Sequence, residues 1–301
     1  MRLRKWLRLN FEIEKNLEDL IIWKLTELRI GSYAFNFLKN KPNYFNVEIW
    51  ILDSKCTDQF KVQLETTLKN LFKDNSYNPP DFYWKDINED WLESWKKFWG
   101  PTEIGNDFLV LPSWMDVPKA SQSKKIIKID PGAAFGTGSH PSTSLCLKEM
   151  ENIKIERKKV LDIGCGSGIL TIAAKLLGGN NLFALDHDYL AINSAKENIK
   201  LNFGNSSKID VYEGSFQEFI INKQIKDFDL VMCNILADVI KEIIPSISSV
   251  LNLDGKIILS GILSSQQREI IKILNLNHLS VDNVSSRKDW VCIKATKKKQ
   301  S

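Results

Sequence analysis

The sequence is poor in the residues that build metal centres and disulfide frameworks. It contains five cysteines, and none of them forms a C-x-x-C pair. An odd and scattered set of this kind argues against a disulfide framework. The three histidines, His140, His187 and His278, are too far apart in the chain to indicate a metal site. We therefore expect no metal, and we expect Cys165 and Cys233 to be small core residues.

The sequence also lacks the features of membrane proteins and of strongly basic nucleic-acid binders. No apolar run approaches the roughly 18 residues of a membrane-spanning helix. The basic N-terminus has no signal-peptide core, because charges return at Arg8 and Glu12. The 41 Lys and Arg against 37 Asp and Glu leave a net charge of +4. We expect a cytoplasmic protein that needs neither a membrane nor direct contact with nucleic acid.

The most informative stretch is an apolar strand that runs directly into a glycine-rich turn. Val160 to Ile163 is the strand, and Gly164, Gly166 and Gly168 alternate in the turn. A helical pattern then follows over 169–177. Glycines at these positions permit a tight bend and let a ligand lie against the main chain. The N-terminus of the helix supplies unpaired N–H groups.

A second strand, over 181–186, ends in the carboxylate of Asp186, 22 residues after Gly164. In nucleoside-binding α/β folds an acid at this distance binds the ribose hydroxyls. The alternative is that Asp186 only caps the next helix. A dinucleotide site needs a small third residue in its fingerprint, and this chain has Ile169 there. The G-x-G-x-G pattern instead resembles motif I of Rossmann-like methyltransferases that use S-adenosylmethionine.

The first block of the chain predicts a small α+β domain over 1–87. Its patterns follow the order β-α-β-β-α-β of a ferredoxin-like fold. A helical linker is expected over 88–100, with Trp91, Trp95 and Trp99 along one face. In this block, strands are expected near 6–11, 33–38, 45–51 and 82–84, and helices over 17–28 and 60–72.

The remainder, 101–301, predicts a Rossmann-like α/β catalytic domain. Alternating strands and helices imply a parallel sheet, and the last two strands, joined without a helix, suggest an antiparallel edge. Strands are expected over 104–111, 124–129, 160–163, 181–186, 209–212, 228–233, 256–259, 279–284 and 289–295, and helices over 169–177, 189–203, 237–251 and 266–274.

A glycine- and hydroxyl-rich loop over 133–143 precedes the glycine turn. Pro141 marks the start of a helix, so Thr143 lies in the first helical turn. There its hydroxyl can meet a ligand carboxylate together with free N–H groups. Capping is the alternative role for Ser139, Ser142 and Thr143.

Three motifs together resemble bacterial ribosomal protein methyltransferases of the PrmA type. They are the loop 130–143, the turn 162–170 and the segment Asn234-Ile235-Leu236. From residue 100 to the end the resemblance is close, whereas the N-terminal block matches in size and predicted topology only. The resemblance implies a monomeric S-adenosylmethionine-dependent enzyme. It would methylate lysine side chains and the N-terminal amine of protein eleven of the large ribosomal subunit.

The resemblance also implies the cofactor site. The implied contacts are Thr137, Thr143, Gly164, Gly166, Asp186 and Asn234. Asn234 follows the strand expected over 228–233, at the carboxyl end of the sheet where such folds bind ligands, and it is the candidate for orienting the amine. No pair of acids suited to act as a base is visible, so we hypothesise that water removes the proton. His140 is either a base or an anchor for its loop.

Three other functions are compatible with parts of this pattern. The first is an amine methyltransferase of the same fold that acts on a different protein or small molecule. The second is a cofactor-binding regulator without activity, against which the retained Asn234 argues. The third is an NAD oxidoreductase, which Ile169 disfavours.

Overall fold

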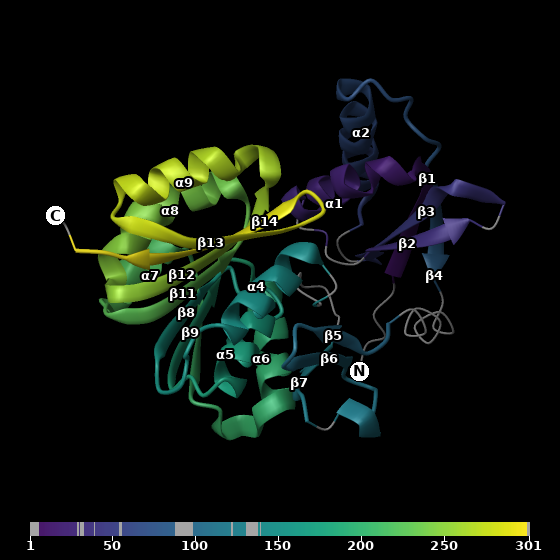
Figure 1. Ribbon diagram of the computed structural model, residues 1–301. Helices are drawn as coiled ribbons and strands as arrows, with labels where there is room; N and C mark the ends of the chain where they lie inside the picture. Colours follow the sequence, from purple (N-terminus) through teal and green to yellow (C-terminus); the bar gives the residue numbers. More distant parts are fainter. Residues whose placement is uncertain are drawn as a thin grey trace. The chain divides into compact units, whose positions relative to one another are not determined.

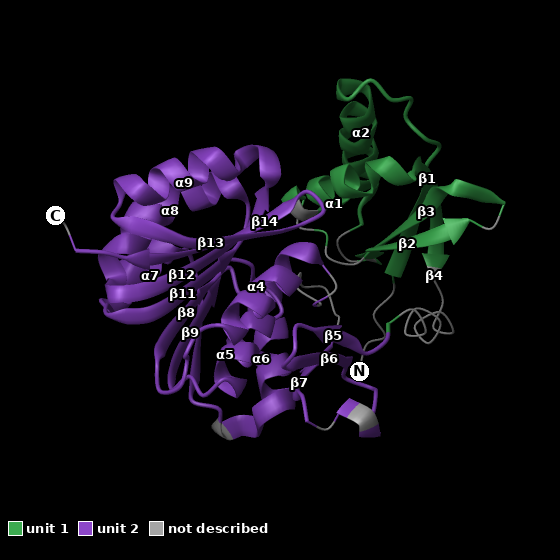
Figure 2. Cartoon of the chain, viewed as in Figure 1, with its two compact units in different colours: residues 1–99 green, residues 100–301 purple. Residues whose placement is uncertain are grey.

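The structure is a computed structural model, and it divides into two compact units, residues 1–99 and 100–301 (Figure 2). It describes residues 6–28, 30, 33–38, 40–53, 56–87, 99–121, 123–130, 138 and 140–299. Most of the predicted 88–100 linker, including Trp91 and Trp95, therefore lies outside the described residues. Within the described residues, no helix combines the length and apolar character needed to cross a membrane.

Unit 1 has the predicted β-α-β-β-α-β order. Its sheet has the strand order β2-β3-β1-β4, with antiparallel pairing throughout. This is the ferredoxin-like arrangement that the sequence predicts. The elements are β1 (Trp6–Glu14), α1 (Glu18–Glu27), β2 (Tyr33–Leu38), β3 (Lys41–Leu52), α2 (Asp58–Asp74) and β4 (Tyr83–Ile87).

The core of unit 1 follows from alternation along its strands. Leu7, Leu9, Phe11 and Ile13 are buried on one face of β1, while the residues between them are more exposed. They form one apolar cluster with the buried stripe of α2, which includes Leu64, Leu68 and Leu71. Burial of one sheet face against two helices gives this unit its own core.

Unit 2 is built on a seven-stranded sheet with the order β10-β9-β8-β11-β12-β14-β13. The pairs from β10 to β12 are parallel, and β14 is antiparallel to both of its neighbours. The strands are β8 (Lys159–Ile163), β9 (Asn181–Asp186), β10 (Ile209–Glu213), β11 (Phe228–Asn234), β12 (Leu251–Leu263), β13 (Leu279–Arg287) and β14 (Trp290–Lys297).

Helices cover both faces of this sheet. Figure 1 shows α4, α5 and α6 on one face and α7, α8 and α9 on the other. Such a doubly covered parallel sheet confirms the predicted Rossmann-like class. The helices are α4 (Pro141–Glu151), α5 (Ile169–Leu176), α6 (Tyr189–Phe203), α7 (Phe216–Lys223), α8 (Ala237–Val250) and α9 (Gln267–Leu276).

A small third sheet lies against α5 and α6. It consists of β5 (Thr102–Ile104), β6 (Phe108–Pro112) and β7 (Lys125–Ile129), with β6 in the centre. β5 pairs antiparallel with β6, and β7 pairs parallel with it. Because the loop that carries Thr143 starts where β7 ends, this sheet fixes one end of that loop.

The structure corrects two details of the sequence prediction and confirms a third. The strand expected over 104–111 is a hairpin, because Gly105 has a φ of +60° and the Glu151 carboxylate accepts from the Asn106 and Asp107 amides. The predicted antiparallel edge is confirmed, because β13 and β14 lie at one end of the sheet and pair antiparallel with each other. The prediction also omitted α7, whose start carries a capping box of Ser215 and Glu218.

The five cysteines all lie in the described part of the chain, and all are buried thiols. Cys165 follows β8, and Cys233 lies in β11. Burial raises the pKa of both thiols, so they remain protonated near neutral pH. Their predicted role as small core residues is confirmed.

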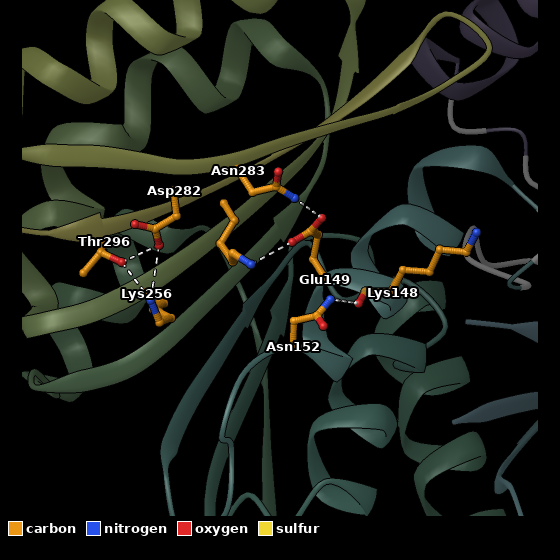
Figure 3. A network of polar contacts seen from close by, with 8 residues as sticks. Lys148, Glu149, Asn152, Lys256, Asp282, Asn283 and Thr296 are labelled. Carbon is orange, nitrogen blue, oxygen red and sulfur yellow. Dashed lines mark hydrogen bonds and ion pairs between the residues drawn. The ribbon is translucent and has the colours of Figure 1, made fainter. Parts of the chain in front are cut away.

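A polar network fastens α4 to the end of the large sheet (Figure 3). Glu149 on α4 is 5% exposed; it accepts from Asn283 Nδ2 at 2.7 Å and pairs with Lys294 Nζ at 3.0 Å. The pairing of β13 with β14 shifts by one residue between Val281 and Asn283. This bulge places Asn283 opposite Lys294, so both side chains reach the same carboxylate.

The Glu149–Lys294 pair gives a test of how α4 is held. The Glu149→Gln variant should lower the free energy of unfolding by about 3 kcal/mol, because it leaves the Lys294 ammonium, whose side chain is only 14% exposed, without its counter-charge. Urea unfolding measures this loss. The double variant Glu149→Leu with Lys294→Met should recover most of it. A single variant as stable as the wild type would contradict this account.

Candidate functional site

The residues that the sequence analysis selects come together at the carboxyl ends of three adjacent strands. Gly164 follows β8, Asp186 ends β9 and Asn234 ends β11. β8 lies between the other two strands and pairs in parallel with both. The strand order changes direction between β8 and β11, and α/β sheets bind ligands in the crevice at such a point.

The glycine turn needs glycine for two separate reasons. Gly164, Gly166 and Gly168 have φ values of +70°, +54° and +81°, which other residues adopt only with strain. In addition, a Cβ on Gly168 would lie 3.2 Å from the Cα of Ala195 on α6. The third glycine of the turn therefore permits close packing on α6, while Ile169 begins α5 and is buried.

Asp186 holds the glycine turn rather than capping the next helix. Its Oδ2 accepts from the Gly166 amide at 3.0 Å, and its Oδ1 accepts from the Asp188 amide at 3.0 Å. The cap of α6 is Asp188, whose carboxylate accepts from the Leu190 amide. The alternative interpretation, that Asp186 only caps the next helix, is therefore wrong, because Asp188 is the cap.

A second carboxylate, Asp162, lies inside the same turn. Its Oδ2 accepts from both the amide and the hydroxyl of Thr171, at 3.1 and 2.6 Å. Its Oδ1 is buried and receives no hydrogen bond from the described residues. Burial raises the pKa of Asp162 to about 7, and the negative charge of Asp186 adds to this rise. The hydrogen bonds from Thr171 act in the opposite direction. This acceptor is therefore available to a cationic ligand.

Thr143 and Asn234 are in direct contact, although 91 positions separate them in the sequence. Asn234 Nδ2 donates to Thr143 Oγ1 at 3.3 Å. Asn234 Oδ1 is buried, and no donor among the described residues reaches it. A buried amide oxygen without a donor is costly unless a ligand supplies one. The pair thus presents an acceptor at the end of β11.

His140, and not a serine or threonine, caps α4. The Ser142 amide donates to His140 Nδ1 at 3.2 Å, and Ser142 Oγ lies 2.7 Å from the same nitrogen. Nδ1 is therefore an acceptor, and the neutral ring carries its proton on Nε2. Burial, with smaller contributions from Lys288 and Arg287, lowers the pKa of His140 to about 3. The ring also packs edge-on against Trp290, with centroids 4.7 Å apart.

The segment after Asn234 is fixed by close approach to two glycines. A Cβ on Gly164 would overlap the side chain of Ile235, and a Cβ on Gly261 would overlap its backbone carbonyl. Gly261 has a φ of +81° and lies where β12 shifts register against β14. This is the geometry of a bulge that requires glycine. The bulge lets β12 pack closely against Ile235. This contact fixes the position of the neighbouring Asn234 at the end of β11.

Some predicted site residues cannot be placed. Thr137 and Ser139 lie outside the described residues. Two residues of α6 that support the site, Asn198 and Asn202, were not predicted from the sequence. Their signal is that Asn198 lies in the apolar stripe of α6 beside Ala195 and Ile199, where a polar residue is unexpected.

The chain matches the family model for ribosomal protein L11 methyltransferase (PrmA) over residues 5–298. It is 50% identical over 298 residues to a ribosomal protein L11 methyltransferase of Prochlorococcus marinus strain MIT 9515, covering 99% of each chain. It is 34% identical to that of Parasynechococcus marenigrum strain WH8102, covering 86% of this chain and 90% of the relative.

Among solved structures, the ribosomal protein L11 methylase from Lactobacillus delbrueckii subsp. bulgaricus is similar, with a TM-score of 0.61 and 31% identity. The match covers 67% of this chain and 100% of the other. The family match includes the N-terminal unit, which the sequence motifs alone left with a weaker resemblance. The chain belongs to the PrmA family of ribosomal protein L11 methyltransferases.

Proposed function

We propose that this chain transfers methyl groups from S-adenosylmethionine to amino groups of ribosomal protein L11. The acceptors are lysine side chains and the N-terminal amine. The observation that carries the proposal is the meeting of Gly164, Asp186 and Asn234 at the switch point of the sheet. Relatives that bear the name ribosomal protein L11 methyltransferase match both units, and they support the choice of substrate.

The described residues fit the chemistry of this cofactor. Asp186 uses one lone pair on each oxygen for the Gly166 and Asp188 amides, which leaves acceptor capacity for ribose hydroxyls. The unpaired Oδ1 of Asp162 suits an ammonium group. Gly166 carries no side chain, so an adenosine can lie against the backbone of the turn there. When bound, S-adenosylmethionine supplies an electrophilic methyl group on a sulfonium.

Asn234 is proposed to orient the incoming amine. Its Oδ1 accepts an N–H of the neutral amine, while Nδ2 stays bonded to Thr143. A neutral acceptor directs the nitrogen without retaining it as a tight ion pair. Removing a proton from a lysine of pKa about 10.4 at pH 7 costs roughly 4–5 kcal/mol. Water takes this proton, and alignment by Asn234 supplies the entropic part of the rate enhancement.

The N-terminal unit is proposed to bind L11 and to present its amino groups in turn. Its compact core is separate from that of unit 2, so it can act as a recognition domain. The division of the chain is proposed to be 1–87 for recognition, 88–100 as a linker and 101–301 for catalysis. The enzyme is further proposed to act as a monomer in the cytoplasm, without direct contact with nucleic acid.

The first prediction is the reaction itself. Unmethylated L11 from the same cell, incubated with the enzyme and S-adenosylmethionine, should gain multiples of about 14 Da on lysines or on the N-terminus. Intact-mass and fragment spectra measure this gain. Asp186→Ala should bind the cofactor about 10- to 100-fold more weakly, because charged hydrogen bonds are lost.

Asp188→Asn is the matched control for this experiment. Asparagine caps a helix as well as aspartate does, so this neighbouring variant should keep wild-type activity. If the wild type binds S-adenosylmethionine but leaves L11 unchanged, L11 is not the substrate and an amine methyltransferase for another acceptor replaces this proposal.

A second prediction concerns pH. Below its pKa of about 7, Asp162 is protonated and neutral. A cationic ligand favours the ionised carboxyl, so cofactor affinity should rise as the pH increases from 5.5 to 7, and binding should release a proton. Titration calorimetry in buffers of different ionisation enthalpy measures the number of protons released when the cofactor binds. In Asp162→Asn the affinity should be flat over this range, and equal proton release by both proteins would refute the assignment.

A third prediction concerns His140. Its Nδ1 is used by the cap and its pKa is about 3, so it is too weak a base to take a proton from an amine. His140→Asn retains a capping side chain and should keep kcat within about threefold, with an unchanged pH profile. His140→Ala should lose about 1 kcal/mol of stability. A large fall in kcat for His140→Asn, with loss of one limb of the profile, would restore the role of base.

A further inference from the structure

One side chain on α6 connects the two loops that the cofactor site depends on. Asn198 is 1% exposed. Its Nδ2 donates to the Ser167 carbonyl at 2.9 Å, and its Oδ1 accepts from the Asp130 amide at 2.8 Å. Ser167 lies inside the glycine turn, between Gly166 and Gly168. Asp130 is the residue from which the loop that carries Thr143 departs.

The two bonds of Asn198 explain why a polar residue occupies an apolar position. Burying an unpaired amide costs about 1–3 kcal/mol, and here both ends of the amide are bonded. Both partners are backbone groups, so Asn198 joins the main chain of the glycine turn to the main chain at the end of β7. The length of this amide therefore contributes to the separation between Ser167 and Asp130.

Asn202, one turn further along α6, makes bonds of a different kind. It accepts from the Lys128 amide at 2.9 Å and donates to the Lys128 carbonyl at 2.7 Å. A second donation, at 2.8 Å, goes to the Asn198 carbonyl on its own helix. Asn202 thus forms hydrogen bonds with the backbone groups of Lys128 on the edge strand β7, as a neighbouring strand would. Among the described residues, Asn202 makes no hydrogen bond to the glycine turn, so it is a suitable comparison for Asn198.

We propose that Asn198 is a positioning residue that fixes the glycine turn relative to the end of β7 at Asp130, and thereby sets cofactor affinity. The inference rests on the proposed function, because it takes the glycine turn as part of the S-adenosylmethionine site. Asn198 is buried and is assigned no contact with the cofactor or the acceptor. It acts through Ser167 and Asp130, and so prepares the site before the ligand arrives.

The test compares variants of Asn198 and Asn202 in the full chain. Asn198→Leu keeps the volume and removes both loop bonds, while Asn202→Leu removes the matched bonds to β7. Calorimetry gives the Kd for S-adenosylmethionine, and urea unfolding of the ligand-free protein gives stability. We expect both variants to lose stability, but only Asn198→Leu to bind S-adenosylmethionine about tenfold or more weakly. Asn202→Leu should stay within about threefold of the wild type.

Asn198→Gln keeps the amide and adds one methylene, so it tests spacing even where the leucine variant does not fold. It should keep most of the stability and still bind the cofactor several-fold more weakly. Hydrogen exchange of segment 164–170 in the ligand-free protein should rise in Asn198→Leu more than in Asn202→Leu, whereas exchange of segment 123–130 should rise in both variants. Wild-type Kd in Asn198→Gln, or equal losses of affinity in the two leucine variants, would overturn the proposal.

These outcomes separate the inference from the proposed function. If the wild type fails to bind S-adenosylmethionine, the proposed function falls, and the inference falls with it. If the wild type binds the cofactor and methylates L11 while the Asn198 variants match the Asn202 variant, only the inference falls.

Discussion

The site depends on two carboxylates that hold one turn of backbone. Asp162 receives the Thr171 amide and hydroxyl, and Asp186 receives the Gly166 amide. Each bond offsets part of the cost of burying a carboxylate beside another one. Because these amides are already used, the turn is not simply a free helix N-terminus that awaits an anion. What it offers a ligand are the remaining acceptors of the two acids, and these suit hydroxyl and ammonium groups.

Glycine in this molecule acts mainly by permitting close approach. Gly164 and Gly261 make room for the side chain and the backbone of Ile235, and Gly168 makes room for Ala195. Each contact brings a different element toward the carboxyl ends of β8 and β11. These contacts pack the glycine turn, through Ile235, against the bulge in β12 and also against α6. A methyl group added at any of the three glycines would therefore displace neighbouring atoms.

The sequence was sufficient for the features that local chemistry determines. The strand–turn–helix around Gly164, the acid that ends β9 and the ferredoxin-like order of unit 1 all follow from periodicity and spacing. The hairpin at Gly105 and the helix after Ser215 also had local signals, a turn tripeptide and a capping box, which the prediction did not use. Long-range contacts could not be predicted in this way. The hydrogen bonds of Asn198 to Ser167 and Asp130 depend on tertiary structure, which no local pattern encodes. The same holds for the contact between Ile235 and Gly261.

Tertiary contacts of the same kind argue against His140 as the base in the proposed reaction. His140 is a plausible base in the sequence, but in the fold its Nδ1 caps α4 and its ring is buried against Trp290. Asp186 accepts from the turn, and the open oxygen of Asp162 is assigned to the ammonium group of the cofactor. Under the proposed function, an amine at this site therefore arrives neutral or loses its proton to water. The proposed role of Asn234 is alignment of that amine, since nitrogen would gain positive charge as sulfur lost it, and such a transfer needs no strong acid or base in its transition state.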